Sequence, residues 1–306
     1  MSKVETYVAK NEARLNNKQI LALIGVLFTA FFWGFGFVVM KTTLDALSPL
    51  YILCFRFIIG GIGMLVFFFP KVKEAQKSDF LPGCVVGVLV FLAYVLQTYG
   101  LMHTTASNNA FLTTFYVILV PFINVLINRK RGARLRIVHV LASLIAVFGI
   151  GLLSLTDRFT MRFGDVLTLL CSLVFTFHIA FLDRYTAEHD PIILNTIQIV
   201  VCAVLSFLGA LIFEGPPPVA AVFTYDVIIS LAQLGLISTM LCFLFQIIGQ
   251  KYLAPTLVSI TLSLECVFGA VFSILILGDP LTVRILAGFS LMFCAVIFSI
   301  LSGNKD

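Results

Sequence analysis

Apolar stretches about 20 residues long recur along the whole chain, and they restrict its fold more than any other feature. A bilayer core of about 30 Å is crossed by roughly 20 helical residues. Sixty per cent of the 306 residues are hydrophobic and 11% are charged, whereas a soluble domain has about 25% charged residues. The sequence therefore predicts an all-α membrane protein that crosses the bilayer many times.

Ten stretches have the length and composition of a membrane span, which predicts ten transmembrane helices. They run at about 19–40, 49–69, 80–101, 105–127, 137–155, 165–185, 191–213, 225–249, 255–277 and 283–301. Residues 1–18 form a polar tail, and the apolar segment after it lacks a signal-peptidase site, so it is expected to stay as the first span. The connections are short and leave no soluble domain for separate chemistry.

All seven cysteines fall inside the predicted spans, and the chain has no CxxC pair. We interpret them as small packing residues, and we expect no disulfide, metal site or cofactor.

Lys and Arg are distributed unevenly between the two sides. With a cytoplasmic amino terminus, 15 of the 20 Lys and Arg residues lie in inside segments, four lie in outside segments, and Arg56 lies within a span. Cytoplasmic loops carry such an excess, so both termini are predicted to be cytoplasmic. The basic cluster at 129–136 is interpreted mainly as a topology anchor. The net charge of +5 reflects this bias, and we expect no nucleic-acid partner.

The two halves of the chain resemble each other weakly. A shift of 142 places Pro191 on Pro49 and Gln198 on Arg56, and a shift of 149 places Gln246 on Gln97. The same shift of 149 places Glu265 on Tyr116, Phe243 on Tyr94 and Gly249 on Gly100. This pattern indicates a duplicated five-span unit, at 19–155 and 164–301. Because five is odd, the second copy should be inverted in the membrane, which suits alternating access.

Glu265 is a lone carboxylate in the middle of the ninth span, with Thr261 on the same helix face. A charge at the membrane centre costs about 2.5–3.5 kcal/mol, so it should face a cavity or a partner. Two interpretations stay open. Glu265 could couple transport to a proton or bind a cation, or it could join two helices through Thr or Tyr hydroxyls.

Other polar residues inside spans also have two interpretations. Arg56 lies about two turns into the second span, and we favour a structural or gating role over substrate contact. His178 is interpreted first as a hydrogen-bonded packing residue and second as a functional one. Trp33 is equally consistent with packing and with cavity lining. Pro121 is expected to kink the fourth span.

The chain resembles the drug/metabolite transporter superfamily, specifically the EamA-type ten-span transporters. The residues that carry this resemblance are Trp33-Gly34, Phe37, Lys41, Pro49, Phe55-Arg56-Phe57, Gly100, Thr105-Ala106, Phe111-Leu112, Pro121, Gly164-Asp165, Leu264-Glu265, Gly278-Asp279-Pro280-Leu281-Thr282 and Gly288. Two positions depart from the family pattern. Cys266 follows Glu265 where the family often has Pro, and Asp279 stands where it often has Glu.

The resemblance implies a multi-pass transporter of the plasma (inner) membrane with a central cavity. The expected substrates are small organic metabolites such as amino acids or related compounds, moved down their gradient or with a coupled proton or other ion. The residues implied to line the cavity are Trp33, Tyr94, Gln97, Asn109, His178, Gln246 and Glu265.

Two other functional classes stay as alternatives. A polytopic membrane enzyme is disfavoured because the chain has no HExxH, no GxSxG and no pair of aspartates within spans. A passive channel is disfavoured because the chain is duplicated and has no ring of charges.

Overall fold

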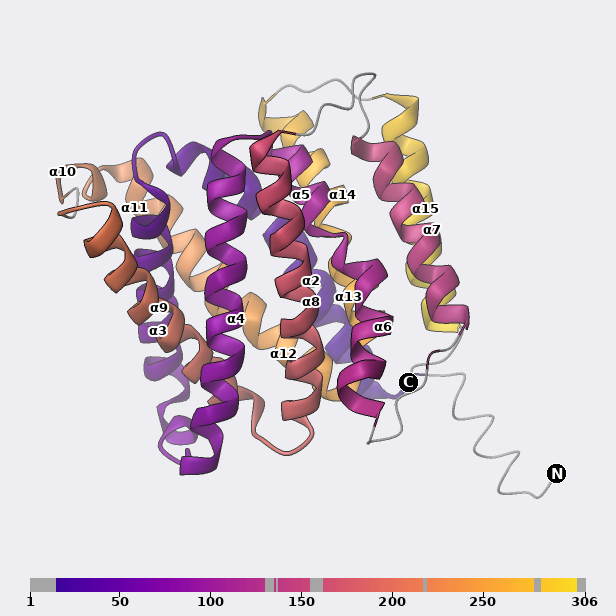
Figure 1. Cartoon of the computed structure of the whole chain (residues 1–306), viewed down its shortest axis with the longest axis horizontal. Coiled ribbons are helices and arrows are strands. Elements are labelled where there is room, and N and C mark those ends of the chain that lie inside the picture. The colour runs from indigo at the N-terminus through magenta and orange to yellow at the C-terminus, as the bar shows by residue number, and fades with distance from the viewer. Residues whose placement is uncertain are drawn as a thin grey trace.

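The computed structural model describes residues 15–129, 135, 137–154, 162–216, 219–277 and 282–301, and every regular element in this part is a helix (Figure 1). Three predicted features lie outside the described residues: most of the amino-terminal tail, most of the basic cluster at 129–136, and 278–281 of the turn before the last span. The elements of the first half are α2 (Asn17–Thr43), α3 (Pro49–Val72), α4 (Lys77–Met102), α5 (Ala106–Thr113), α6 (Tyr116–Asn128) and α7 (Ile137–Ser154).

The second half begins at α8 and contains two π-helical segments. Its elements are α8 (Phe163–Thr186), α9 (Pro191–Phe213), α10 (Val219–Val222), α11 (Tyr225–Ala232), η2 (Gln233–Leu241), α12 (Cys242–Tyr252), α13 (Pro255–Leu262), α14 (Glu265–Phe272), η3 (Ser273–Leu277) and α15 (Val283–Leu301).

Eight described helical segments are long and apolar enough to cross a membrane. They coincide with eight of the ten predicted spans. The predicted fifth and tenth spans correspond to α7 and α15, whose apolar stretches Val140–Gly149 and Leu286–Phe298 are shorter than the other eight. The prediction of a helical, multi-pass membrane protein is therefore confirmed.

Two of the spanning segments are interrupted at equivalent places. The first interruption lies between α5 and α6, and the second lies between α13 and α14. At the first, the Thr114 hydroxyl donates to Phe111 O at 2.7 Å, and at the second the Ser263 hydroxyl donates to Ile260 O at 2.7 Å. Such hydroxyl bonds to the preceding turn bend helices. The fourth span is therefore interrupted seven residues before Pro121, which lies within α6.

The interruptions repeat at the spacing found in the sequence. Shifting by 149 places α5 on α13 residue for residue, and it places the first residue of α6 on the first residue of α14. In Figure 1, α5 lies above α6, whereas α14 lies above α13. The two equivalent pairs thus run in opposite directions along the bundle.

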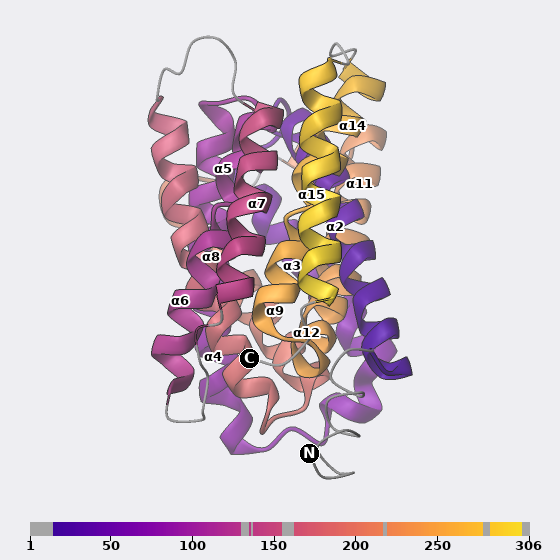
Figure 2. The same cartoon turned by 90° about the vertical axis from the view of Figure 1, so that its right-hand side faces the viewer.

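Each half packs mainly against the other half. Helix α4 packs on α8, and the equivalent α12 packs on α2. Helices α3 and α9 pair at one edge of the bundle, while α7 and α15 pair at the opposite edge (Figures 1 and 2). This arrangement places the centre of the molecule between the halves, at the contacts of α2, α4, α5, α6, α8, α12, α13 and α14.

The α3–α9 pair is held at both ends by groups from the two halves. At one end the Glu214 carboxylate accepts hydrogen bonds from the Ser48 hydroxyl at 2.6 Å and from the Leu50 and Tyr51 amides at 3.0 and 3.2 Å. At the other end Lys71 lies 3.5 Å from Asp190. Ser48 and Asp190 are the N-cap residues of α3 and α9, respectively, so the ends of these helices are joined in a related way.

Candidate functional site

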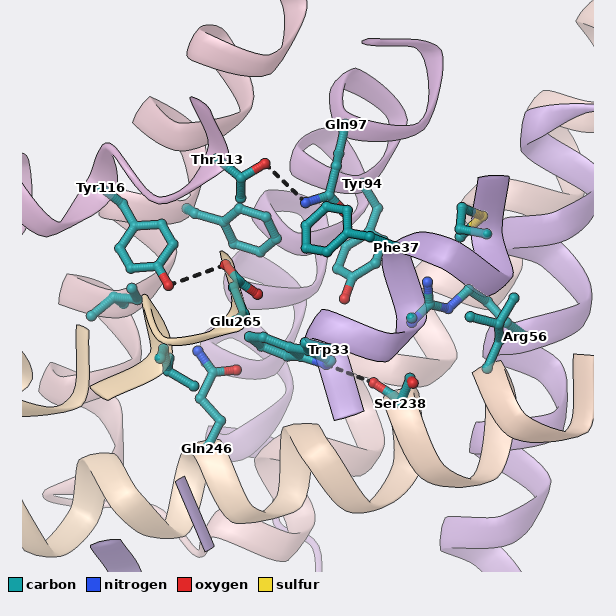
Figure 3. Close-up of a pocket in the computed structure, with 16 residues that line it drawn as sticks. Trp33, Phe37, Arg56, Tyr94, Gln97, Thr113, Tyr116, Ser238, Gln246 and Glu265 are labelled. Carbon is teal, nitrogen blue, oxygen red and sulfur yellow. Dashed lines mark hydrogen bonds between the residues drawn. The ribbon is translucent and has the colours of Figure 1, made fainter. Parts of the chain in front are cut away.

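A cavity lies between the two halves, and the space between its lining atoms, open solvent included, is about 530 Å³ (Figure 3). Its lining residues come from seven spanning segments. They are Trp33, Gly36, Phe37, Met40, Arg56, Tyr94, Gln97, Thr113, Tyr116, Phe175, Ile179, Leu234, Ser238, Gln246, Leu262 and Glu265. Only about 40 Å³ of this space is free for the centres of water molecules, so the site is nearly closed in this structure and narrower than the usual small-molecule site of roughly 300–1,000 Å³.

Ten of these lining residues form five pairs of repeat-equivalent positions. The pairs are Trp33 with Phe175 and Phe37 with Ile179, both 142 apart, and Gln97 with Gln246, Thr113 with Leu262 and Tyr116 with Glu265, all 149 apart. The cavity is therefore formed at the interface of the two halves, with equivalent positions of both halves in its wall, and not within either half.

Glu265 lies in the cavity wall at the first residue of α14, and 3% of its surface is exposed. The Tyr116 hydroxyl, at the start of α6, donates to its Oε1 at 3.3 Å (Figure 3). The broken span positions this carboxylate, because the helix restarts at Glu265. The predicted Glu265–Tyr hydroxyl contact is thus present, and the carboxylate faces the cavity as well.

Arg56 also lines the cavity, although the sequence favoured a structural or gating role for it over substrate contact. Its Nε donates to Thr239 Oγ1 at 2.9 Å, and its guanidinium carbon lies 4.6 Å from the centre of the Tyr94 ring. Cation–π contact of this kind offsets part of the cost of burying a charge. No ion pair between described residues includes Arg56 or Glu265.

Trp33 is fixed by the π-helical segment η2. Its Nε1 donates to Ser238 O at 2.8 Å, and its ring lies 5.3 Å from that of Phe243 in a T-shaped contact. Within η2 the Thr239 hydroxyl donates to Leu234 O, five residues earlier. Because π-helical turns free backbone carbonyls and often occur at functional sites, η2 explains how Ser238 O is available to the indole.

The two equivalent glutamines supply amide groups on opposite sides of the cavity. Gln97 Nε2 donates to Thr113 Oγ1 at 3.2 Å. Gln246 is 1% exposed, and its Oε1 has no hydrogen-bond partner among the described residues. A buried amide oxygen without a partner is costly, so it is a candidate acceptor for a ligand in the cavity.

Asn109 and His178 do not line this cavity. Asn109 Nδ2 donates to Gln97 O at 3.1 Å and to Thr168 Oγ1 at 2.8 Å, which joins α5 to α4 and α8. His178 Nε2 lies 3.2 Å from Gln198 Oε1. Both side chains are fully buried. The structure brings together Trp33, Tyr94, Gln97, Gln246 and Glu265 from the predicted set, and it adds Arg56.

Sequence reasoning did not select Tyr116, Thr113 or Ser238 as site residues. Tyr116 and Thr113 share the helical stripe of Asn109, and Tyr116 is the repeat equivalent of Glu265, so the alignment of the halves was a signal for it. Ser238 contributes its carbonyl through η2, for which the sequence carries no clear signal. No group of three or more His, Cys, Asp or Glu in the described ranges is placed to hold a metal ion.

Known proteins with similar sequences are transporters by name. The model of the EamA-like transporter family matches residues 20–155 and again 162–301. An uncharacterized transporter of Archaeoglobus fulgidus is 30% identical over 288 residues, which is 92% of this chain and 87% of that protein. The uncharacterized transporter YoaV of Bacillus subtilis is 24% identical over 286 residues, or 92% of this chain and 97% of that protein.

A more distant relative and a solved structure extend the comparison. The S-adenosylmethionine/S-adenosylhomocysteine transporter of Chlamydia muridarum is 22% identical over 294 residues, covering 91% of this chain and 92% of that protein. A crystal structure with 15% sequence identity has the same fold, with a TM-score of 0.76 over 92% of this chain and 97% of the solved one. The chain is a multi-pass membrane transporter, and it belongs to the EamA-like transporter family of the drug/metabolite transporter superfamily.

Proposed function

We propose that this chain is a secondary-active transporter that moves small organic metabolites by alternating access. In this proposal it has ten spans, formed by two inverted five-helix repeats at 19–155 and 164–301. The opposite directions of the equivalent pairs α5–α6 and α13–α14 support the inversion. Inverted repeats can exchange conformations and so open a shared site to either side in turn.

The observation that carries the proposal is the position of the cavity between the repeats. Five pairs of equivalent residues contribute to its lining, and Tyr116 bonds its own equivalent, Glu265, at 3.3 Å. A site at the interface of two repeats stays at the centre of the molecule when the repeats exchange conformations. A substrate held there would be exposed to one side and then to the other.

The charges in the cavity favour substrates with an amino-acid group. Arg56 offers a guanidinium to a carboxylate, whereas Glu265 offers a carboxylate to an ammonium. In the view of Figure 3 the rings of Tyr94 and Trp33 lie between these two side chains. The relative from Chlamydia muridarum is named for S-adenosylmethionine and S-adenosylhomocysteine, which both carry such a group. We therefore propose amino acids or related zwitterions as substrates.

Glu265 is the proposed coupling residue. Its carboxyl faces the cavity, and no described cation pairs with it. It is thus placed to take up a proton, or to bind a cation, in one state and to release it in the other.

The proposed location is the plasma membrane with both ends of the chain in the cytoplasm. The excess of Lys and Arg in the inside segments supports this orientation. It is consistent with α2 beginning and α15 ending toward the same end of the bundle (Figures 1 and 2). In this orientation α3 begins, and α2 ends, at the outer surface.

Counterflow in proteoliposomes tests the proposed function. Vesicles are loaded with one unlabelled amino acid from a panel, and uptake of the same labelled amino acid is followed from outside. A carrier gives saturable uptake that internal substrate accelerates. A linear flux that internal substrate does not change indicates a channel, and no flux across a broad metabolite panel would contradict the proposal.

A further inference from the structure

The cavity is not symmetric, because some lining residues have repeat equivalents that are buried elsewhere. Gly36, Met40 and Arg56 line it, but their equivalents 142 residues later, His178, Leu182 and Gln198, do not. All three of those equivalents have 0% of their surface exposed. One half of a symmetric site is thus formed, and the other half is closed.

Two of the lining residues without a lining equivalent, Met40 and Arg56, lie near one end of the bundle. Met40 is three residues from the end of α2 at Thr43, and Arg56 is seven residues from the start of α3 at Pro49. In the second half, Leu182 and Gln198 occupy the matching places near the end of α8 and the start of α9. If the repeats are inverted, these places lie toward the opposite end.

We propose that His178 and Gln198 form the substrate-contacting half-site of the state in which the cavity opens at the α8–α9 end. This inference rests on the proposed function, in which the repeats exchange conformations. The exchange takes α8 and α9 to the arrangement that α2 and α3 now have. His178 and Gln198 then stand where Gly36 and Arg56 now stand.

The closed half-site contains polar side chains that would line the cavity if this end opened. His178 Nε2 lies 3.2 Å from Gln198 Oε1, and Gln198 Nε2 donates to Asn195 Oδ1 at 2.8 Å. His178 Nδ1 is buried and has no hydrogen-bond partner within the described part of the chain. A buried polar atom without a partner is costly. Opening the cavity at this end would give that nitrogen a ligand or water.

The two half-sites differ in charge. Arg56 presents a fixed cation to a substrate at the α2–α3 end, whereas Gln198 presents a neutral amide at the α8–α9 end. A carboxylate would be held more tightly by the guanidinium. The half-maximal substrate concentration should therefore be lower when substrate is supplied from the α2–α3 side.

Accessibility of paired cysteines tests this inference. The first pair of variants is Gly36→Cys and His178→Cys, each made in a chain whose seven native cysteines are replaced. Each variant is also made in the native chain, and there the labelling of the wild type is subtracted from that of the variant. The second pair is Met40→Cys and Leu182→Cys. A Cβ at Gly36 would stand 3.4 Å from Ser238 Oγ, an ordinary contact, so this variant should fold. A membrane-impermeant methanethiosulfonate is applied to right-side-out and to inverted vesicles.

We expect the cysteines at 36 and 40 to react from the α2–α3 side. Those at 178 and 182 should react at least tenfold faster from the α8–α9 side than from the α2–α3 side. Labelling of positions 178 and 182 from the α2–α3 side would overturn the proposed half-site. The absence of labelling from both sides, in a chain that still performs counterflow, would overturn it as well. If no metabolite is exchanged but 178 and 182 react from the α8–α9 side, the half-site stands and the proposed function falls.

Discussion

Tyr116 donates a hydrogen bond to Glu265 across the centre of the molecule, and the two residues occupy the same position in the two halves. Each begins the second part of an interrupted span, α6 or α14. In the proposed inverted repeat, two equivalent residues can touch only near the axis that relates the two halves. That axis would pass between the Tyr116 phenol and the Glu265 carboxylate, which places this pair at the point that both halves share.

Replacing Glu265 with Gln should abolish the stimulation of uptake by a pH gradient, while counterflow should continue at a higher half-maximal substrate concentration, because the amide cannot form an ion pair with the substrate's ammonium group. The amide keeps the shape of the side chain and can still accept from the Tyr116 hydroxyl, but it cannot exchange a proton. Uptake into proteoliposomes is measured with and without a pH gradient. Uptake by Glu265→Gln that responds to pH as the wild type does would remove the coupling role.

Tyr116→Phe is the matched variant for the same hydrogen bond. It deletes the donor and keeps the carboxyl, so uptake should still respond to pH. Hydrogen bonds within membranes contribute about 0.6 kcal/mol on average, so the loss of stability should be at most about 1–2 kcal/mol. Loss of the pH response in Tyr116→Phe would instead assign the coupling to the pair of residues.

Gly34→Ala should destabilise the fold, whereas Gly36→Ala should not. A Cβ at Gly34 would stand 2.6 Å from Phe268 Cβ and 2.7 Å from the Glu265 carbonyl, and backbone cannot yield easily. A Cβ at Gly36 would stand 3.4 Å from Ser238 Oγ. Overpacking of this kind costs about 1–3 kcal/mol.

Thermal unfolding of both alanine variants in the same detergent measures the difference. The unfolding midpoint of Gly34→Ala should fall by several degrees relative to Gly36→Ala. Equal midpoints would mean that α2 and α14 are not in close contact beside Glu265.

Arg56→Gln should weaken binding of substrates with a carboxylate and spare those without one. Loss of a charge-assisted hydrogen bond worth about 1.5–3 kcal/mol corresponds to about a tenfold or larger rise in half-maximal concentration. Arg56→Lys keeps the charge but loses the flat contact with Tyr94, so it should give an intermediate value.

The measurement for Arg56 is inhibition of counterflow by an amino acid and by its decarboxylated amine. In wild type the amino acid should inhibit better, and in Arg56→Gln the two should inhibit alike. A preference for the amino acid that persists in Arg56→Gln would place the carboxylate elsewhere in the cavity.

Much of the fold could be predicted from the sequence, because the residues that determine it act within their own segment of the chain. Apolar runs of spanning length predict helices in any bilayer, and the offsets of 142 and 149 indicated the duplication. Glu265 was singled out because a charge within a span should face a cavity or a partner. Gln97 and Gln246 entered the predicted set through the family resemblance, and all three line the cavity. The EamA-type resemblance was confirmed by the family match.

The remaining features depend on contacts between distant segments. His178 was interpreted first as a hydrogen-bonded packing residue, and cavity lining was implied only by the resemblance. Its bond to Gln198 depends on how α8 and α9 both pack on α4 and α12. Arg56 was expected to have a structural or gating role, and its contact with Tyr94 requires α3 and α4 to meet. The interruptions at Thr114 and Ser263 carry only a hydroxyl as a signal, which is weaker than that of Pro121. The pattern of single residues along a sequence does not show which of them become neighbours in three dimensions.

Glu214→Ala should lower stability more than removal of any surface carboxylate. The Glu214 carboxylate accepts from the Ser48 hydroxyl and two amides at the start of α3, and from the Tyr99 hydroxyl at 3.0 Å. Loss of this carboxylate leaves these partly buried donors without their acceptor at the end where α3 and α9 are joined. Leaving such groups unpaired costs about 1–3 kcal/mol.

Glu74→Ala is the matched control, because Glu74 also follows a spanning helix but pairs with Lys71 at 2.6 Å on an exposed surface. Exposed pairs contribute about 0.2–1 kcal/mol, so its unfolding midpoint should change little. Both variants are compared by thermal unfolding at low and at high salt. The Glu74→Ala effect should vanish at high salt, whereas that of Glu214→Ala should persist because its partners are mainly uncharged donors. Equal and salt-sensitive effects would show that Glu214 acts only as a surface charge.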